Sequence, residues 1–236
     1  MKYGNVKQVA AFGKLVGICN DLGASYNPSK ATLSSTALVT LLEQAQQKVE
    51  AVNVARTQFL LAVNARQESF AALPAITSRM VRALAATESS AENIRDARIL
   101  RQRLSSNRFP KQVTASVGSD QPTVKTRSIS RLDFESQADS FSKLIQLVQR
   151  IPDYAPNEVD LQVSALTNLL TELKLKTQQV AKAANEFATV RIERNKVLAG
   201  KNGMYETAAA VKEYIRSVFG VRSEAARELG KLKLVA

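Results

Sequence analysis

The chain repeats part of its own sequence in its second half. Twelve residues of the first half recur there, at a constant offset and without a gap. In the first copy they are Tyr26, Pro28, Leu33, Ala37, Leu38, Leu41, Leu42, Lys48, Val52, Ala55, Phe59 and Arg66, and in the second Tyr154, Pro156, Leu161, Ala165, Leu166, Leu169, Leu170, Lys176, Val180, Ala183, Phe187 and Arg194. A repeated sequence unit builds the same supersecondary unit each time. The repeat therefore predicts a pseudo-symmetric body of two similar pieces.

Each copy contains one long stretch with helical periodicity. From Thr32 to about Phe70 there is neither proline nor glycine, and apolar residues return every three or four positions. The matching stretch runs from Asp160 to about Ala199. Two helices of about 39 residues are far longer than the mean of about 11–12. We therefore predict an all-α, elongated antiparallel bundle with an internal two-fold axis and shorter helices covering the long ones.

Shorter elements flank the long stretches in both copies. Amphipathic helices are expected over 5–22 and from residue 134, each followed by a turn at Tyr26–Ser29 or Tyr154–Asn157, because a proline disfavours helix in the residue before it. We interpret the recurring tyrosines as packing groups over these corners, not as functional hydroxyls. Aligning Val81 with Ile215 would give the second copy about six additional loop residues around 200–205.

The final short helix of each copy has its own start signal. Ser89 to Glu92 has the spacing of a capping box, which predicts a helix beginning after Ser89. The stretch from Ser223 is its expected counterpart in the second copy.

These patterns divide the chain into three regions. We predict a first helical repeat over 1–104, a linker over 105–131 and a second helical repeat over 132–236, with the repeats packed as one body. The linker contains two alternating β-branched stretches around Gly118-Ser119-Asp120, which favour a β-hairpin arm. A plain extended linker is the alternative.

Positive charge is concentrated around this linker. Of the net charge of +12, residues 95–131 contribute nine cations minus two acids, or +7. The candidate anion- or nucleic-acid-contacting residues are Arg95, Arg98, Arg101, Arg103, Arg108, Lys111, Lys125, Arg127 and Arg131. A basic protrusion of this kind is typical of proteins that contact phosphate. Arg95, Arg98 and Arg101 fit equally well the solvated face of a helix that buries Ala97, Leu100 and Leu104.

Composition narrows the chemistry. The chain has no histidine, the commonest general base and transition-metal ligand, and no tryptophan. Its single cysteine, Cys19, lies in an apolar helical stretch, which favours a buried thiol in a reducing compartment. We find no apolar run long enough for a signal core or a membrane span, so we expect a cytoplasmic protein. No catalytic, metal-binding or cofactor-binding residue is predicted.

Some recurring polar residues are assigned structural duties. Arg66 and Arg194 recur in register beside Lys48 and Lys176, which favours a shared duty such as an ion pair with an acid of the opposite copy. Tyr26, Pro28, Tyr154 and Pro156 belong to the same repeat-conserved structural set as the two arginines.

One stretch of the sequence resembles a known group of proteins. The run from Lys14 to Gly23, continued by Tyr26–Lys30 and echoed at Tyr154–Glu158, resembles an uncharacterised conserved family of Bacteroidetes proteins. The resemblance spans both copies and implies a bacterial, cytoplasmic setting. It brings no activity, cofactor or partner.

Two functions remain open at this stage. The first is a non-enzymatic structural or interaction protein that presents long helical faces to a protein partner or to copies of itself. The second is a nucleic-acid- or ribosome-associated protein that binds phosphate through residues 95–131. No membrane contact and no small-molecule substrate is expected, and an enzyme using Lys, Tyr or carboxylates is a third, less favoured class.

Overall fold

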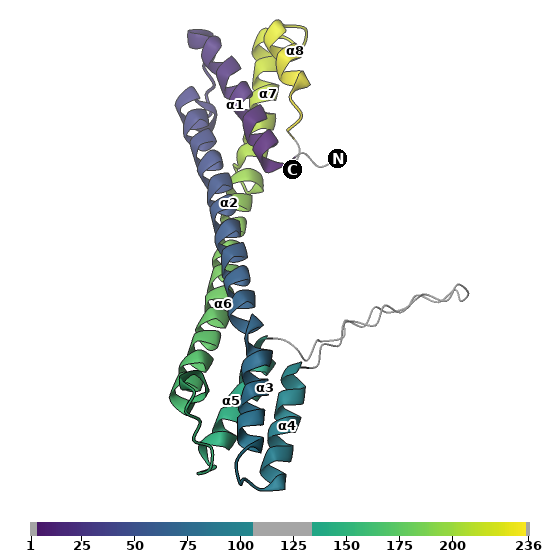
Figure 1. Ribbon diagram of the computed structural model, residues 1–236. Coiled ribbons are helices and arrows are strands. Elements are labelled where there is room, and N and C mark those ends of the chain that lie inside the picture. The colour runs from purple at the N-terminus through teal and green to yellow at the C-terminus, as the bar shows by residue number, and fades with distance from the viewer. Residues whose placement is uncertain (1–3, 106–133, 235–236) are drawn as a thin grey trace, which may run out of the picture. The chain divides into compact units, whose positions relative to one another are not determined.

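A computed structural model of the chain describes residues 4–105 and 134–234 (Figure 1). Within these ranges the protein is all-α and contains no strand. The β-hairpin predicted around Gly118-Ser119-Asp120 lies outside the described residues, as does nearly all of the predicted 105–131 linker.

The chain divides into two compact units. Unit 1 comprises residues 1–60 and 182–236, and unit 2 comprises residues 61–181. The division falls inside both long helices and cuts across the two sequence copies. Each unit therefore combines the beginning of one copy with the end of the other.

Unit 1 is built from the two ends of the chain. Its elements are α1 (Asn5–Asp21), η1 (Gly23–Ser25), η2 (Ala31–Leu33), the first part of α2 (Ser35–Ala71), the last part of α6 (Val163–Ala199), α7 (Met204–Phe219) and α8 (Glu224–Lys231). Helix α7 packs on α1, α8 and η2 (Figure 1).

Unit 2 is built from the middle of the chain. Its elements are the end of α2, α3 (Leu73–Ala85), α4 (Ala91–Ser105), α5 (Phe134–Gln149), η3 (Val159–Leu161) and the beginning of α6. Helix α4 packs on both α3 and α5, and η3 packs on α3 (Figure 1).

The long helices begin three residues later than predicted. Helices α2 and α6 each contain 37 residues. The first residues of the two helices, and likewise their last residues, are separated by the same offset as the sequence repeat. The residues expected to form their first turns are instead the 3₁₀ helices η2 and η3. At the start of α2, the Ser34 hydroxyl accepts a hydrogen bond from the Ala37 N–H at 3.3 Å, which satisfies one of the free donors of the first turn.

Each unit has its own apolar core, and corresponding positions of the two copies fill it. Phe12, Leu15 and Leu38 are fully buried in unit 1. Phe141, Leu144 and Leu166 are fully buried in unit 2. The apolar side chains on one face of each amphipathic helix therefore supply the burial that stabilises its unit.

The two corners predicted from the tyrosine–proline pairs are built alike. The Tyr26 hydroxyl donates to the Leu33 carbonyl oxygen at 2.6 Å, and the Tyr154 hydroxyl donates to the Leu161 carbonyl oxygen at 3.0 Å. Both rings are buried. Each tyrosine thus fixes the segment between a short helix and the following 3₁₀ turn, and each hydroxyl is used within the fold.

Helices α3 and α7 match in more than one register. Buried residues at 73, 77, 80 and 84 in α3 have the same spacing as those at 204, 208, 211 and 215 in α7, and those at 73, 77 and 81 have the same spacing as those at 207, 211 and 215. The expected alignment of Val81 with Ile215 therefore stays a prediction, whereas the six additional loop residues were wrong. The connection after α6 is only three residues longer than the one after α2.

Backbone geometry explains the composition of that longer connection. Asn202 has a φ of 55°, in the left-handed region that asparagine tolerates better than most residues. A Cβ on Gly203 would lie 2.7 Å from the Gly200 carbonyl oxygen. Gly200-Lys201-Asn202-Gly203 is a helix-ending turn.

The cap of α4 also differs from the prediction. The Ser90 hydroxyl, not that of Ser89, accepts the hydrogen bond from the first turn of the helix, from the Asn93 N–H at 3.3 Å. Ser89 instead forms a hydrogen bond with Thr87, hydroxyl to hydroxyl at 2.7 Å. In α8, Ser223 is the cap and accepts from the Ala226 N–H at 3.2 Å.

Candidate interaction surfaces

The predicted basic cluster is only partly within the described residues. Its members on α4 are Arg95, Arg98, Arg101 and Arg103, whereas Arg108, Lys111, Lys125, Arg127 and Arg131 lie outside the described ranges. On α4, Ala97 and Leu104 are buried in the core of unit 2, as the alternative interpretation of this helix required, whereas Leu100 packs against that core and is only half-buried.

The four arginines of α4 do not form one surface. Arg95 and Arg98 are exposed, while Arg101 is half-buried and its Nε is buried without a hydrogen-bond partner. Arg98 and Arg103 lie about 140° apart around the helix axis, because each residue of an α-helix turns it by roughly 100°. Arg103 therefore belongs to the side of α4 that meets α5, and Arg98 does not.

A groove of about 400 Å³ runs between α4 and α5 in unit 2. Its lining residues are Asp96, Ile99, Leu100, Arg103, Lys143, Gln146, Leu147 and Arg150. Three cations and one acid thus surround an apolar floor. The Lys143 ammonium also pairs with Asp139 one turn earlier on α5, at 2.6 Å.

A second groove, of about 730 Å³, lies along α2 and α6 in unit 1. Its lining residues are Gln46, Gln47, Glu50, Ala51, Val54, Ala55, Gln58, Glu186 and Val190. Val54 is 48% exposed in this groove, which Ala51 and Val190 also line. Exposed apolar side chains on two adjacent helices offer a surface that a partner helix can cover.

Two contacts hold α2 and α6 together in unit 1. The Lys48 ammonium pairs with the Glu193 carboxylate at 2.7 Å, and this pairing lowers the pKa of Glu193. The rings of Phe59 and Phe187 stack with centroids 6.2 Å apart. The later residue of α2 contacts the earlier residue of α6, so the two helices run antiparallel within this unit.

The repeated arginines have different surroundings. The Arg66 guanidinium carbon lies 4.1 Å from the centroid of the Phe134 ring, and its Nε is buried without a hydrogen-bond partner. Phe134 in turn packs edge-to-face on Phe70. Arg194 donates to the side chain of Asn195, at 2.8 and 3.2 Å. The ion pair expected for these arginines is made by their recurring neighbour Lys48 instead.

The titratable groups of the core belong to the fold. Burial raises the pKa of the Cys19 thiol to about 11. Burial, and next to it the electrostatic effect of the neighbouring Cys19, raises the pKa of Tyr26 well above its usual value. Burial likewise raises the pKa of Tyr154 to about 12. All three groups are therefore neutral at physiological pH, and the two hydroxyls donate hydrogen bonds within the fold. Cys19 is the buried thiol that its apolar surroundings predicted.

Two searches of the described residues gave no further site. Over residues 4–105 and 134–234, no three of the Cys, Asp and Glu side chains gather where they could hold a metal ion. Within the same ranges, none of the helices combines the length and apolarity needed to cross a membrane.

Neither groove was predicted from the sequence. Lys143 and Arg150 belong to the segment that forms α5, outside the 95–131 cluster, and only the pairing of α5 with α4 puts them in the same groove as Arg103. A helical-face plot of α5 could have identified their common side, because they are seven residues apart, but not the helix opposite.

The chain was compared with protein-family models, curated proteins and solved structures, and none of them matches it.

Proposed function

We propose that the protein is a non-enzymatic interaction protein that offers helical surfaces to other helices. The observation that carries the proposal is the α2–α6 groove of unit 1, in which Val54, Ala51 and Val190 form an apolar floor on two antiparallel helices. The charged lining residues are two glutamates, Glu50 and Glu186. The chain contains no histidine, so the commonest general base is not available beside them.

The proposal includes an internal duplication, with coiled-coil-like packing of α2 on α6 within unit 1. Support comes from the identical length of these helices, from their bounds at the same offset as the sequence repeat, and from the paired tyrosine hydrogen bonds of the two corners. A bacterial, cytoplasmic protein remains our expectation from the sequence.

Sedimentation velocity over a wide concentration range tests the proposal in its simplest form, self-association through the α2–α6 groove. We expect the wild-type chain to form dimers or larger species as concentration rises, and Val54→Glu to shift that association to higher concentration. A charge placed on the exposed groove floor would have to be desolvated on association.

The matched control is Gln44→Glu on the same helix, an exposed residue that does not line the groove. Circular dichroism should show equal helicity for all three chains. A wild-type chain that stays monomeric at every concentration, with Val54→Glu indistinguishable from it, would contradict self-association through this surface.

A second function, phosphate binding by residues 95–131, is favoured by the exposure of Arg95 and Arg98 on α4. Fluorescence anisotropy of labelled duplex DNA and structured RNA, from low to physiological salt, measures this binding. Phosphate binding should fall steeply with salt and weaken in the double variant Arg95→Glu/Arg98→Glu, because counterion release drives it. Arg101 is left unchanged because it is half-buried.

Reversing two exposed cations of unit 1, Arg222→Glu and Lys233→Glu, gives a control with the same change in net charge. Equal weakening by both double variants would assign the effect to total charge and not to α4. Binding that does not depend on salt would argue against phosphate contact altogether.

A further inference from the structure

We propose that the α4–α5 groove of unit 2 binds an acidic amphipathic helix of a partner protein. Arg103 on α4 and Lys143 and Arg150 on α5 line this groove together with the apolar residues Ile99, Leu100 and Leu147. This inference concerns a different surface from the α2–α6 groove, and it holds or fails independently of self-association.

The floor of the groove calls for an apolar ligand surface. Ile99 is 42% exposed, and Leu100 and Leu147 are half-buried although both pack against the core of unit 2. Covering such side chains removes apolar surface from water, which favours association. A third helix laid along two antiparallel helices covers a floor of this kind with its own apolar stripe.

The rims of the groove call for negative charge. Lys143 and Arg150 are seven residues apart on α5, which puts them about 10.5 Å apart along the axis, or two helical turns. Carboxylates two turns apart on a partner helix have the matching spacing. Arginine is well suited to this role because its planar guanidinium pairs with a carboxylate through two parallel hydrogen bonds.

The same features count against a nucleic-acid backbone as the ligand of this groove. A phosphate backbone gains little from the apolar floor of Ile99, Leu100 and Leu147, which the apolar stripe of a helix would cover. Arg98, which a continuous phosphate track over α4 would need, lies on the other side of that helix.

The basic rim is not required by helix packing. When α5 is aligned with α1 so that Phe141 matches Phe12, the counterparts of Lys143, Leu147 and Arg150 are Lys14, Ile18 and Asp21. The apolar position keeps its character there, whereas the position of Arg150 carries the opposite charge. The fold thus accepts either sign at this position, which frees Arg150 for an interaction outside the unit.

Fluorescence anisotropy with the full chain and three labelled probes tests the inference. The first probe is an alanine-rich helical peptide of five turns with leucines on one stripe and glutamates two turns apart on both flanks. In the second probe every glutamate is replaced by glutamine, and the third is a short DNA duplex. We expect saturable binding of the glutamate peptide, and binding weaker by about ten-fold or more for the glutamine peptide.

Variants of the chain locate the binding. The double variant Arg103→Glu/Arg150→Glu should weaken binding of the glutamate peptide by about ten-fold or more. Ile99→Ser should weaken binding of both peptides. The control Arg98→Glu/Arg82→Glu makes the same change in net charge at exposed residues of α4 and α3 outside the groove, and should leave peptide affinity within about two-fold. Equal helicity and thermal midpoints exclude unfolding as the cause.

Three results would overturn the inference. They are no saturable binding of the glutamate peptide, equal weakening by the groove and control variants, and a preference for the DNA duplex that the groove variant abolishes. The last would assign the groove to nucleic acid. None of these results bears on the sedimentation of Val54→Glu, so the two proposals are tested separately.

Discussion

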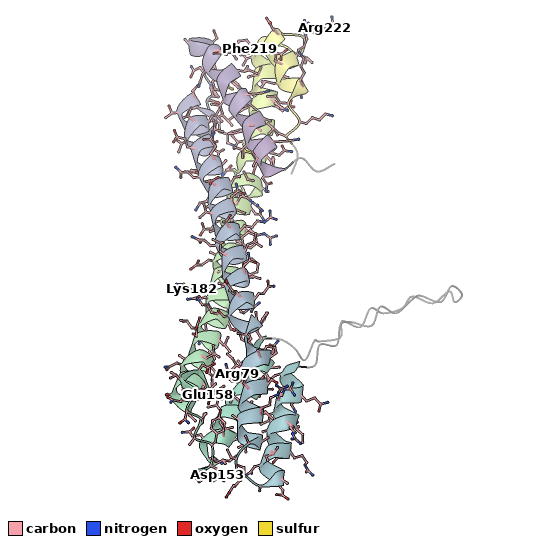
Figure 2. All side chains as sticks on the ribbon, in the orientation of Figure 1. Arg79, Asp153, Glu158, Lys182, Phe219 and Arg222 are labelled. Carbon is pink, nitrogen blue, oxygen red and sulfur yellow. The ribbon has the colours of Figure 1, made fainter. Side chains whose placement is uncertain are left out.

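The corners of unit 1 and unit 2 share one hydrogen bond and differ in the contact that supports it. In unit 1 the Tyr26 ring packs edge-to-face on Tyr214 with centroids 5.4 Å apart, and the Tyr214 hydroxyl accepts from the Asn27 N–H at 3.2 Å. In unit 2 Arg79 pairs with Asp160 through two hydrogen bonds, and Glu158 lies near Arg79 (Figure 2). The aromatic contact of one unit is replaced by an ionic contact in the other.

The contacts that the two corners share indicate which part of the corner the fold depends on. The tyrosine hydroxyl and the carbonyl seven residues later are present in both units, so the turn itself depends on them. In the register that matches Leu73 with Met204, the counterpart of Tyr214 is Ala83 and that of Arg79 is Ala210. Each supporting residue has an alanine as its counterpart, so either support is sufficient.

The last helices of the two copies differ in the same way. Helix α4 has 15 residues and packs on α3 and α5, whereas α8 has 8 residues and packs on α7. After α8 the chain is held by the Lys212 ammonium, which donates to the Leu232 carbonyl oxygen at 2.6 Å. The longer helix of unit 2 is what creates a groove along α5.

The largest effect is expected from the paired core phenylalanines. Phe12 and Phe141 are both fully buried, one in each unit. Phe12→Ala and Phe141→Ala should each lower the free energy of unfolding by about 3–5 kcal/mol, because each loses burial and leaves a cavity. Guanidinium unfolding followed by circular dichroism measures both. A loss several times larger in one unit would break the equivalence of the two cores.

A smaller loss is expected at the corners. Tyr26→Phe and Tyr154→Phe each remove the donor to a backbone carbonyl, which costs about 1–3 kcal/mol when the group is buried. Tyr26 has the shorter bond, so we expect the larger loss at that corner. Urea unfolding of the two variants tests this order, and an unchanged midpoint in both would show that the hydroxyls do not fix the corners.

Alkaline pH should sharpen the comparison of the two corner tyrosines. Burial raises the pKa of Tyr154 to about 12, above the value near 10 of an exposed tyrosine. A pKa raised in the folded state gives stability that is complete below pH 10 and is lost as pH rises towards 12. Tyr154→Phe should therefore flatten the fall in thermal midpoint between pH 10 and 12, whereas Tyr205→Phe, at a less buried ring, should flatten it less.

The smallest effect is expected from the ionic support. Arg79 and Asp160 are about half exposed, and exposed ion pairs are screened by salt. Asp160→Asn should lower the thermal midpoint less than Tyr154→Phe does, and its effect should disappear at molar concentrations of NaCl. Because Arg79 lowers the pKa of Asp160, this contribution is present at neutral pH and is lost as pH falls through the acidic range. A salt-independent loss would point to packing instead of charge.

The periodic parts of the fold were predictable from the sequence. Long runs free of glycine and proline predict helices, and α2 and α6 lie where the periodicity indicates them, apart from their first turns. Those turns were missed because the starts of 3₁₀ and α helices favour the same residues, and the hydrogen bond from the corner tyrosine to the 3₁₀ turn is a tertiary contact that periodicity does not reveal. The register between α3 and α7 stays a prediction, because their buried residues match both in the expected register and in one shifted by three residues.

The candidate surfaces were less predictable, because they depend on pairs of helices. The exposed arginines of α4 were identified from their sequence, but their division between two sides of the helix required the position of α5. Arg66 was assigned to an ion pair, and its contact is the ring of Phe134, since a guanidinium packs on an aromatic face as readily as on a carboxylate. The residues beyond 105 in the basic cluster remain a prediction.

The burial of Cys19 makes the chain a convenient host for chemical labels. It is the only thiol in the sequence, it has no solvent exposure, and its raised pKa keeps it as the unreactive neutral form. A cysteine introduced at exposed Val54 or Ile99 would therefore be the one site that reacts with a maleimide dye at neutral pH. Each groove can then carry its own spectroscopic reporter without removal of the natural cysteine from the core of unit 1.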